Sequence, residues 1–477
     1  MLVWLGLCAF AAAQQPNVIV ILSDDQGTMD IGAAGTPHVV TPTLDKLAAE
    51  GIRFTQFYAA SSICSPSRAS LLTGRYPWRC GVPGNVSPGG PGLPLTEVTM
   101  AEVFRAAGYT TALIGKWHLG TTLDQSPLQQ GFDRYFGHRQ GCIDNWSHFF
   151  YWNGPNRHDL WMGDEVYYED GSHFGDMMVR EAVSFMRENK AHNTLMAAMV
   201  DSQPPPPRRP FFLYLPFNTP HYPMQPKAKW RSHFATKAYA GLEQRRRDYL
   251  ALLATMDEQL GKILAEVERL GQRENTIVVF QSDHGHSTEQ RAFYGGGSAG
   301  QFRGAKFSLF EGGIRVPAVI SWPGKIGGSV TWKNAEDKNS LGGPYGINET
   351  RDQVAHATDW LPTLAELANI PLLPGMDLDG KSLVPVLNDP SAKSAHEVLH
   401  WVVSDQWAVR RGDFKLIVNP RDTDRSRLTQ QDERHKFFLV NLAEDIAEQN
   451  NIRGREGEQL KALRELHAKA LAEFQDK

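Results

Sequence analysis

The sequence is poor in cysteine, with only 4 in 477 residues. If the first 13 residues are removed as a leader, the remaining cysteines are Cys64, Cys80 and Cys142. This number is too small for a disulfide scaffold, and the spacing is not the paired spacing of a zinc site. The fold must therefore be stabilised by its hydrophobic core. A disulfide between Cys80 and Cys142 stays open, because the sequence does not give their separation.

Long basic tracts are also missing, and the formal net charge is −4. A domain that binds nucleic acid normally carries clustered positive charge, which neutralises phosphate groups. We therefore expect no nucleic-acid partner. Hydrophobic and charged residues make up 41% and 21% of the chain, which is ordinary for a globular protein.

The chain begins with a short apolar run, residues 1–13, which ends in small residues before Gln14 and Gln15. This pattern is typical of a secretory signal peptide, although the usual basic residues at its start are missing. The run is too short to span a bilayer. We therefore expect a signal peptide over residues 1–13, no membrane span, and a mature protein that is secreted or periplasmic.

Four short apolar runs are typical of strands that are buried on both faces, as in a parallel sheet between helices. These runs are Asn17–Leu22, Tyr109–Gly115, Phe211–Leu215 and Thr276–Gln281. Between the last two runs, apolar residues from Leu250 to Leu270 recur at helical spacing and predict a crossover helix. We interpret the Arg245–Arg247 run at its start as a solvated helix end.

The pattern changes after about residue 375, where short runs predict antiparallel strands followed by a terminal helix over residues 455–474. The predicted strands are Val398–Val403, Trp407–Arg410, Phe414–Val418 and Phe437–Val440. A chain of this length is expected to form one large domain with a smaller appendage. The predicted fold class is α/β: a large mixed, mostly parallel sheet flanked by helices over residues 16–374, and a smaller C-terminal antiparallel sheet plus helix over residues 375–477.

Each of these four short apolar runs of the large domain is followed by polar residues at its C-terminal end. They are Asp24, Asp25, Lys116, His118, His221, Asp283 and His284. In open α/β sheets ligands bind at this edge, so these side chains are expected to meet in one place. A single lysine is usually a surface residue and a single histidine is often structural. Their shared position after predicted strands favours a functional site instead.

The segment from Cys64 to Gly74 predicts a helix with a reactive residue at its start. Ser65 is expected to cap the helix, Pro66 to occupy its first position and Gly74 to end it. A helix N-terminus favours negative charge, so Cys64 by itself suggests a thiolate nucleophile with a lowered pKa. The surrounding carboxylates and His284 suggest a bound cation, which a simple cysteine hydrolase does not need.

The motifs together closely resemble the formylglycine-dependent (type I) sulfatases of the alkaline-phosphatase-like superfamily. The maturation motif of that family is Cys-x-Pro-Ser-Arg followed by Thr-Gly-Arg, and this sequence has Cys64-x-Pro66-Ser67-Arg68 and Thr73-Gly74-Arg75. The other motifs follow in the family's order: Asp24-Asp25, Gly115-Lys116-Trp117-His118, Thr219-Pro220-His221, Ser282-Asp283-His284-Gly285, Arg303-Gly304-x-Lys306 and Glu311-Gly312-Gly313-x-Arg315-x-Pro317. The resemblance covers nearly the whole mature chain.

This resemblance implies that a formylglycine-generating maturation enzyme oxidises Cys64, and that the hydrated aldehyde attacks the sulfur of a sulfate ester. It implies a metal site formed by residue 64 with Asp24, Asp25, Asp283 and His284. Oxygen ligands favour Ca²⁺, with Mg²⁺ as an alternative. The family often has Asn at the last position, and the imidazole of His284 also admits Mn²⁺.

The resemblance also assigns roles to the remaining polar residues. Arg68 and His118 would orient and polarise the hydrated formylglycine. Lys116 and Lys306 would bind the sulfate oxygens as charge accumulates. His221 would contact the substrate and protonate the leaving alkoxide. The implied catalytic domain covers residues 16–374, and residues 375–477 form the C-terminal subdomain.

Other residues near these motifs have open or structural interpretations. His286, Gln301 and Arg303 are candidates for substrate contact that the sequence cannot rank, whereas Glu311–Pro317 is interpreted as a turn that shapes the rim. Aromatic faces suit sugar rings, but a local core is an equally good interpretation of the aromatic cluster. That cluster consists of Trp146, His148, Tyr151 and Trp152.

The expected substrate is a sulfated carbohydrate such as a sulfated polysaccharide, because export and a polar, aromatic rim suit extracellular glycans. Two alternatives stay open. One is a phosphonate monoester or phosphodiester hydrolase of the same superfamily, and the other is an inactive glycan-binding relative. The second is disfavoured because no expected site position is missing from the sequence.

Overall fold

The structure is a computed structural model that describes residues 15–151, 156–198, 208–323, 325–326, 349–424 and 435–475. The predicted signal peptide, residues 1–13, and Trp152 of the predicted aromatic cluster lie outside the described residues. Within the described ranges, no helix is both long and apolar enough to cross a membrane.

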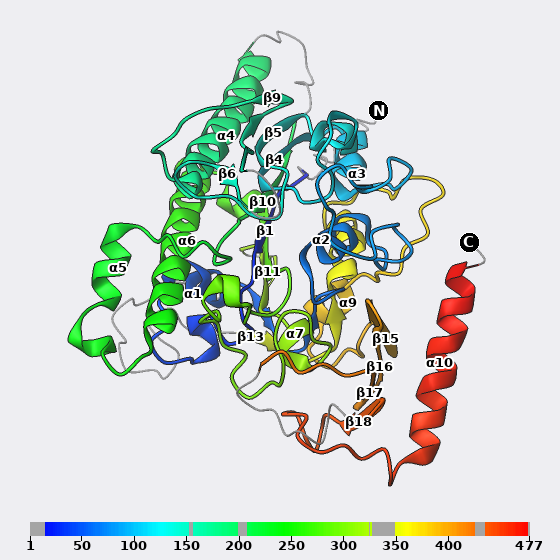
Figure 1. Cartoon of the computed structure of the whole chain (residues 1–477). Helices are drawn as coiled ribbons and strands as arrows, with labels where there is room; N and C mark the ends of the chain where they lie inside the picture. Colours follow the sequence, from blue (N-terminus) through cyan, green and yellow to red (C-terminus); the bar gives the residue numbers. More distant parts are fainter. Residues whose placement is uncertain are drawn as a thin grey trace, which may run out of the picture.

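A ten-stranded mixed sheet forms the centre of the molecule (Figure 1), in the order β13-β2-β12-β11-β1-β10-β4-β5-β8-β9. Its strands are β1 (Asn17–Ser23), β2 (Ile52–Phe54), β4 (Thr110–Lys116), β5 (Arg134–His138), β8 (Trp161–Met162), β9 (Glu165–Val166), β10 (Phe211–Pro216), β11 (Thr276–Ser282), β12 (Ala318–Ser321) and β13 (Glu349–Arg351). The four strands predicted from apolar runs are neighbours, in the order β11-β1-β10-β4, and they pair in parallel. The predicted fold class is confirmed.

Side chains of β1 alternate between two hydrophobic cores, because successive residues of a strand point to opposite faces. Val18, Val20 and Leu22 pack into the core on one face. Ile19 and Ile21 pack into the core on the other face. A strand that is buried on both faces needs apolar residues at every position, which explains the continuous run in the sequence.

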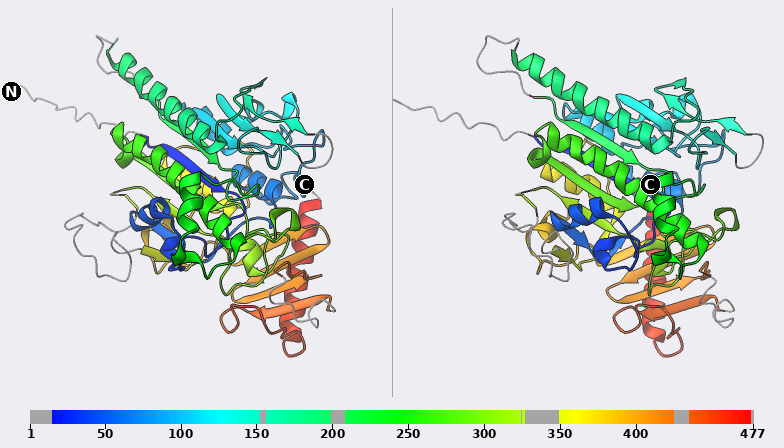
Figure 2. Two further views of the ribbon diagram at one scale, coloured as in Figure 1. Left: turned by 60° about the vertical axis from the view of Figure 1, so that its left-hand side comes forward. Right: turned by 90° about the vertical axis from the view of Figure 1, so that its left-hand side faces the viewer.

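Helices cover both faces of the sheet, as Figures 1 and 2 show. One core contains side chains of α1 (Pro42–Ala49), α4 (Phe174–Ala198) and α6 (Gln244–Arg269). The other contains side chains of α2 (Cys64–Thr73), α3 (Met100–Ala106) and α8 (Trp360–Leu367). The helix α6 is the predicted crossover helix. Shorter elements complete the fold: β3 (Phe57–Tyr58), β6 (Phe149–Phe150), β7 (Arg157–His158), α5 (Ala228–Phe234), α7 (Glu311–Ile314), β14 (Ala355–His356) and α9 (Val384–Asn388).

A separate four-stranded antiparallel sheet follows near the end of the chain, in the order β15-β16-β17-β18. Its strands are β15 (Val398–Val403), β16 (Gln406–Arg411), β17 (Phe414–Val418) and β18 (Phe437–Asn441). The last helix, α10 (Gly457–Gln475), lies along this sheet (Figure 1) and inserts Leu463 into a small core with it. The predicted small sheet with a closing helix is therefore confirmed.

The small sheet is joined to the rest of the molecule through buried charges. Lys415 Nζ on β17 lies 2.8 Å from Glu311 Oε1 and 3.0 Å from Glu448 Oε1, and both Lys415 and Glu311 are fully buried. Tyr58 donates a hydrogen bond of 2.6 Å to Glu311 Oε2. Glu311 is thus an anchor that joins the small sheet to α7 and β3. A structural role for this segment agrees with the interpretation from sequence, but the segment begins with the short buried helix α7 instead of a turn at the rim.

Cys80 and Cys142, whose pairing the sequence left open, are buried free thiols in this structure. They belong to different hydrophobic clusters, since Cys80 packs in the main core and Cys142 packs with Phe150 and Tyr222. Burial raises the pKa of Cys80 to about 12 and that of Cys142 to about 11. Both thiols are therefore protonated and unreactive at neutral pH.

Candidate active site

The candidate site lies at the C-terminal ends of the four central strands. Asp24 and Asp25 follow β1, Lys116 ends β4, and Asp283 and His284 follow β11. Backbone hydrogen bonds hold these ends together, because Asp24 N donates to Thr219 O and Asp283 N donates to Ser23 O, at 3.1 and 3.0 Å. The parallel pairing of the strands therefore places the polar residues of four distant segments side by side.

Cys64 is the first residue of α2, as expected, but the predicted cap is wrong. The residue at the cap position is Ile63, so Ser65 does not cap the helix and Pro66 is not its first residue. Ser65 Oγ instead donates to His118 O at 2.7 Å and accepts from Val86 N at 3.0 Å. The hydroxyl thus ties the helix to the loop that carries His118. Gly74 ends the helix with a φ of 68°, as predicted.

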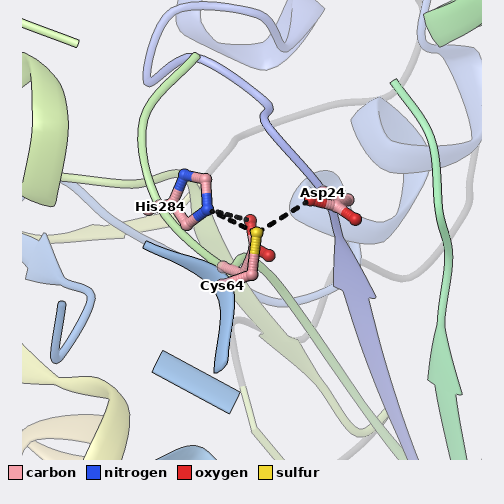
Figure 3. Close-up of side chains that lie close together, drawn as sticks. Asp24, Cys64 and His284 are labelled. Carbon is pink, nitrogen blue, oxygen red and sulfur yellow. Dashed lines mark hydrogen bonds and ion pairs between the residues drawn. The ribbon is translucent and has the colours of Figure 1, made fainter. Parts of the chain in front are cut away.

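The Cys64 sulfur lies at the centre of the site, between His284 and Asp24 (Figure 3). It lies 3.3 Å from His284 Nε2 and 3.8 Å from Asp24 Oδ1, and the residue is 2% exposed. Burial acts to raise its pKa, but Lys116 and Lys306 outweigh burial and lower the pKa to about 6. Of the three described cysteines, Cys64 alone has a lowered pKa, because burial outweighs the neighbouring positive charges at Cys80 and Cys142. The position favours a group that carries negative charge.

Three cations face the three carboxylates of the site. Lys116 Nζ lies 2.6 Å from Asp24 Oδ2, and Lys306 Nζ lies 2.9 Å from Asp25 Oδ1. Arg68 is bound to two of the carboxylates, through Nη2 at 2.9 Å from Asp283 Oδ2 and 3.3 Å from Asp24 Oδ2. Such buried charges are stable only when they are closely paired.

The positive charges are nevertheless shared unevenly among the three carboxylates, as their pKa values show. Burial acts to raise the pKa of Asp24, but the charges of Lys116 and Arg68 hold it well below its usual value. Burial raises the pKa of Asp25 to about 7 in spite of Lys306. Burial and the neighbouring Asp24 also raise the pKa of Asp283. The cluster therefore has room for further positive charge.

The donor set of this cluster fits a divalent cation. Ligand atoms of Asp24, Cys64, Asp283 and His284 all lie within 4.8 Å of one another. His284 Nδ1 lies 2.9 Å from Gly285 O, which directs Nε2 toward Cys64. Carboxylate oxygens suit Ca²⁺ or Mg²⁺, and an added imidazole also suits Mn²⁺. Asp25 lies at the edge of the set, with Oδ1 at 3.5 Å from His284 Nδ1.

The two other histidines of the site are buried and differ in their partners. His221 Nδ1 lies 2.7 Å from Tyr222 O, so this nitrogen carries the proton and Nε2 faces Asp25 Oδ2 at 3.6 Å. Burial lowers the pKa of both His221 and His118 well below the usual value. His118 has a φ of 55°, and its Nδ1 has no hydrogen-bond partner among the described residues. Both rings are therefore neutral and available for hydrogen bonds to a ligand.

Lys306 comes from the long loop between β11 and β12 rather than from a strand end. Its backbone N donates to His286 O at 2.9 Å, and its Nζ lies 3.3 Å from Glu289 Oε2. Sequence reasoning missed Glu289, because an isolated Glu in a loop carries no signal of its partner. Arg303, left open as a substrate contact, has Nε at 2.7 Å from Asp422 Oδ2 and joins the loop to the C-terminal region.

A cleft of about 710 Å³ lies beside His286. Arg245, Arg246, Tyr294 and Ser298 are among the residues that line it. Arg246 Nη1 lies 2.7 Å from both Asp30 Oδ1 and Gly296 O. The interpretation of Arg245–Arg247 as a solvated helix end is therefore wrong for Arg246, because the loop that contains Gly296 folds back onto the helix.

The predicted aromatic cluster is not a single group in the structure. Trp146 packs edge-on against His173, with ring centroids 5.0 Å apart, and Lys227 Nζ lies 5.5 Å from its ring centroid. His148 is instead near His158, with ring centroids 6.2 Å apart. Tyr151 is partly exposed. Trp146 and His148 therefore pack against different partners and do not form one aromatic surface.

Comparisons with known proteins agree across nearly the whole chain. The family model described as Sulfatase matches residues 16–370. Arylsulfatase A of Homo sapiens is 34% identical, over 96% of this chain and 88% of the human protein. N-acetylgalactosamine-6-sulfatase of Rattus norvegicus is 30% identical, over 96% of this chain and 85% of the rat protein. The crystal structure of Ps i-CgsB in complex with k-i-k-neocarrahexaose superimposes with a TM-score of 0.77 at 26% identity, over 95% of this chain and 92% of that chain.

Proposed function

Because the chain belongs to the sulfatase family, and is thus a sulfuric ester hydrolase, we propose that it hydrolyses sulfate monoesters of carbohydrates with a formylglycine at position 64. The observation that carries the proposal is the position of Cys64. Its sulfur lies within 4 Å of both Asp24 and His284, in a buried site that also contains Arg68, Lys116 and Lys306. This surrounding stabilises negative charge on residue 64 and on a bound sulfate.

Before the first turnover, a maturation enzyme uses an external oxidant to convert the cysteine side chain to an aldehyde, so that sulfur leaves and oxygen takes its place, and water adds to the aldehyde to give a geminal diol. The proposed reaction then proceeds in two steps at residue 64. One diol oxygen attacks the sulfur atom, the bond from sulfur to the alcohol oxygen breaks, and sulfate becomes bound to residue 64. The second hydroxyl then loses its proton, the carbon–oxygen bond to sulfate breaks, and the aldehyde is restored. A serine could not complete this second step, because it has a single hydroxyl.

The other side chains of the site have roles that follow from their positions. Lys116 and Lys306 bind sulfate oxygens, since both ammonium groups lie in the buried cluster around residue 64. Arg68 and His118 orient the two hydroxyls of the hydrated aldehyde. His221 donates a proton to the leaving alkoxide through Nε2 once that nitrogen is protonated, because Nδ1 is engaged with Tyr222 O.

The proposed cation is held by Asp24, Asp25, Asp283 and His284, together with residue 64. It supplies positive charge that lowers the energy of the developing negative charge on the sulfate. Ca²⁺ is the first choice because carboxylate oxygens dominate the donor set, and Mg²⁺ and Mn²⁺ are the alternatives. The raised pKa values of Asp25 and Asp283 support the binding of further positive charge at this place.

A carbohydrate is the proposed carrier of the sulfate. The cleft beside His286 is lined by basic and acidic residues, among them Arg245, Arg246, Glu243 and Asp424, and such hydrogen-bonding groups suit a sugar. The rat relative is named for the sugar N-acetylgalactosamine, and Ps i-CgsB was crystallised with k-i-k-neocarrahexaose. We also propose that residues 1–13 direct export to a secreted or periplasmic location, and that residues 16–374 and 375–477 form the catalytic domain and the C-terminal subdomain.

The decisive experiment is the release of free sulfate from a panel of defined sulfated sugars, measured by ion chromatography. Matched phosphate and phosphonate esters of the same alcohols are tested beside them, and the Cys64→Ala variant is the control. We expect turnover of at least one sulfated sugar and little turnover of the matched phosphorus esters. Preferred hydrolysis of the phosphorus esters would favour a phosphonate monoester or phosphodiester hydrolase. Binding of sulfated sugars with no turnover by protein carrying formylglycine would favour an inactive glycan-binding relative.

A further inference from the structure

A second group of metal-ligating side chains lies outside the catalytic cluster. It consists of His148, His158 and Asp170, whose ligand atoms all lie within 4.8 Å of one another. The three residues come from different segments. His148 precedes β6, His158 ends β7, and Asp170 lies in the turn before α4. No role of the catalytic site uses any of them.

His148 is oriented like a histidine that binds a metal. It is fully buried and adopts a φ of 61°, which a non-glycine residue adopts rarely. Its Nε2 lies 3.0 Å from Ser172 O and must donate the proton to that carbonyl. The lone pair is therefore on Nδ1, which has no hydrogen-bond partner among the described residues. In metal-binding histidines a carbonyl commonly fixes the other ring nitrogen in this way.

His158 provides the second free nitrogen. Its side chain is 6% exposed, and neither ring nitrogen has a hydrogen-bond partner among the described residues. Its ring stacks on Tyr168 with centroids 4.2 Å apart, which fixes the plane of the imidazole. The fixed ring of His158 therefore offers an unpartnered nitrogen to a ligand.

Asp170 adds an anionic ligand that opens to solvent. Its Oδ1 lies 3.9 Å from His158 Nε2, and its side chain is 65% exposed. Zinc ligands at about 2.0–2.1 Å in a tetrahedron are about 3.4 Å apart. Rotation of the exposed carboxylate can therefore bring Asp170 Oδ1 from 3.9 Å to this distance from His158 Nε2. The two imidazole nitrogens already lie within 4.8 Å of each other.

We propose that His148 Nδ1, His158 Nε2 and Asp170 bind a transition-metal ion, with Zn²⁺ as the first choice. Two imidazoles and one carboxylate favour Zn²⁺, Co²⁺ or Ni²⁺ over Ca²⁺, which prefers an all-oxygen set. The ion connects the His148 segment, the paired strands β6 and β7, and the turn before α4. Phe150 of β6 belongs to the same hydrophobic cluster as Tyr222, the residue after His221, so the ion stabilises the structure next to the catalytic site.

The test is a metal titration of the full-length, Ca²⁺-loaded enzyme with Co²⁺ and Zn²⁺. We expect one equivalent of Co²⁺ with the visible absorption of a four-coordinate imidazole site, and its displacement by Zn²⁺. His158→Ala and Asp170→Asn should remove or strongly weaken this equivalent. His233→Ala, which changes an exposed histidine on α5, should retain it.

Two results would overturn the proposal. One is a wild-type protein that binds no Co²⁺ or Zn²⁺ with Ca²⁺ present. The other is an equivalent that persists in folded Asp170→Asn and His158→Ala but disappears in Asp283→Ala, because the ion would then be in the catalytic cluster. Asp170 is a surface residue, so its variant is expected to fold even if His158→Ala does not. The readout is metal binding, so it is independent of whether a sulfated sugar is the substrate.

Discussion

Arg68 Nη2 lies 2.9 Å from Asp283 Oδ2, and both side chains are fully buried. The same nitrogen lies 3.3 Å from Asp24 Oδ2. One guanidinium group, carried by the helix that begins at Cys64, therefore holds carboxylates from the ends of two neighbouring strands. Because these carboxylates are the proposed metal ligands, Arg68 determines where residue 64 and the cation lie relative to each other.

This relationship predicts that Arg68→Lys is not a conservative change. A lysine has one ammonium group and cannot reproduce the planar arrangement of donors, so it leaves a buried carboxylate poorly paired. We expect kcat/KM to fall roughly a hundredfold, the size of effect seen when one preorganised donor is lost. Arg134→Lys, on the partly exposed ion pair with Glu181, is the control and should be close to wild type. Near-normal turnover of folded Arg68→Lys would contradict the assignment.

A second prediction concerns the maturation of Cys64. Active material should contain a peptide across position 64 that has lost sulfur and gained oxygen, because an unconverted thiol cannot complete the elimination step. Peptide mass spectrometry gives the converted fraction, and specific activity should rise in proportion to it. Fully active enzyme with only unmodified cysteine at this position would exclude the proposed nucleophile.

The cation site is tested by removing its carboxylates one at a time. Asp24→Ala and Asp283→Ala should each lose nearly all turnover, since each removes a charge that holds the metal beside residue 64. Elemental analysis of each variant should find about one divalent ion fewer than in the wild type. Any ion at the His148 site is counted in both proteins. Asp389→Ala, at an exposed position, is the control. Metal-free protein with full activity would rule the site out.

The role of His221 as general acid is tested by varying the leaving group. A sugar alkoxide is strongly basic and requires a proton as its bond to sulfur breaks, whereas nitrophenolate leaves without one. His221→Ala should therefore reduce kcat/KM on a sugar sulfate by at least about tenfold more than on nitrophenyl sulfate. Lys116→Ala should impair both esters more evenly, because it contacts the sulfate common to both. If His221→Ala lowers kcat/KM equally for both esters, another residue must be the general acid.

Buried histidines outside the site predict how stability depends on pH. Burial lowers the pKa of His356 to about 3 and that of His400 to about 4 in the folded protein, from 6.5 in the unfolded chain. Between these values the unfolded state binds more protons, so stability is fully present above pH 6.5 and is lost as pH falls toward 4. Each histidine should contribute about 1.4 kcal/mol per pH unit to this loss.

The matching measurement is urea unfolding between pH 7 and pH 4.5. His356→Asn should be less stable than the wild type at pH 7. Its free energy of unfolding should also fall less steeply with decreasing pH, because unfolding takes up about one proton fewer. His38→Asn is the control, because His38 is exposed and its φ of 67° suits asparagine. An unchanged slope in His356→Asn would show that this ring is protonated together with its neighbours in the folded state.

Much of the sheet was predictable because its central strands are buried on both faces and therefore read as continuous apolar runs. Outer strands such as β12 (Ala318–Ser321) and β13 (Glu349–Arg351) are too short to give such a signal. The position of Cys64 at a helix start was predictable, but its cap was not. The hydroxyl of Ser65 is bound by residues 118 and 86, which are distant in sequence.

The partners of the site side chains could not be predicted by pattern alone. The contact of Lys306 with Glu289 and the anchor formed by Glu311, Lys415 and Glu448 join segments whose spacing follows no period. Their positions depend on how loops fold against the finished sheet. Sequence patterns indicate which residues end at the sheet edge, whereas side-chain pairing there is a property of the packed structure.

The burial of Cys64 limits when the proposed maturation of this residue can occur during biosynthesis. In the folded chain the residue is 2% exposed, so another enzyme has no access to its sulfur. His284, which covers that sulfur, lies 220 positions later in the chain, and at typical synthesis rates a segment of this length takes on the order of tens of seconds to make. If residue 64 is converted as proposed, the maturation enzyme must therefore act while the chain is still emerging or unfolded, and a chain that folds first would keep an unmodified thiol.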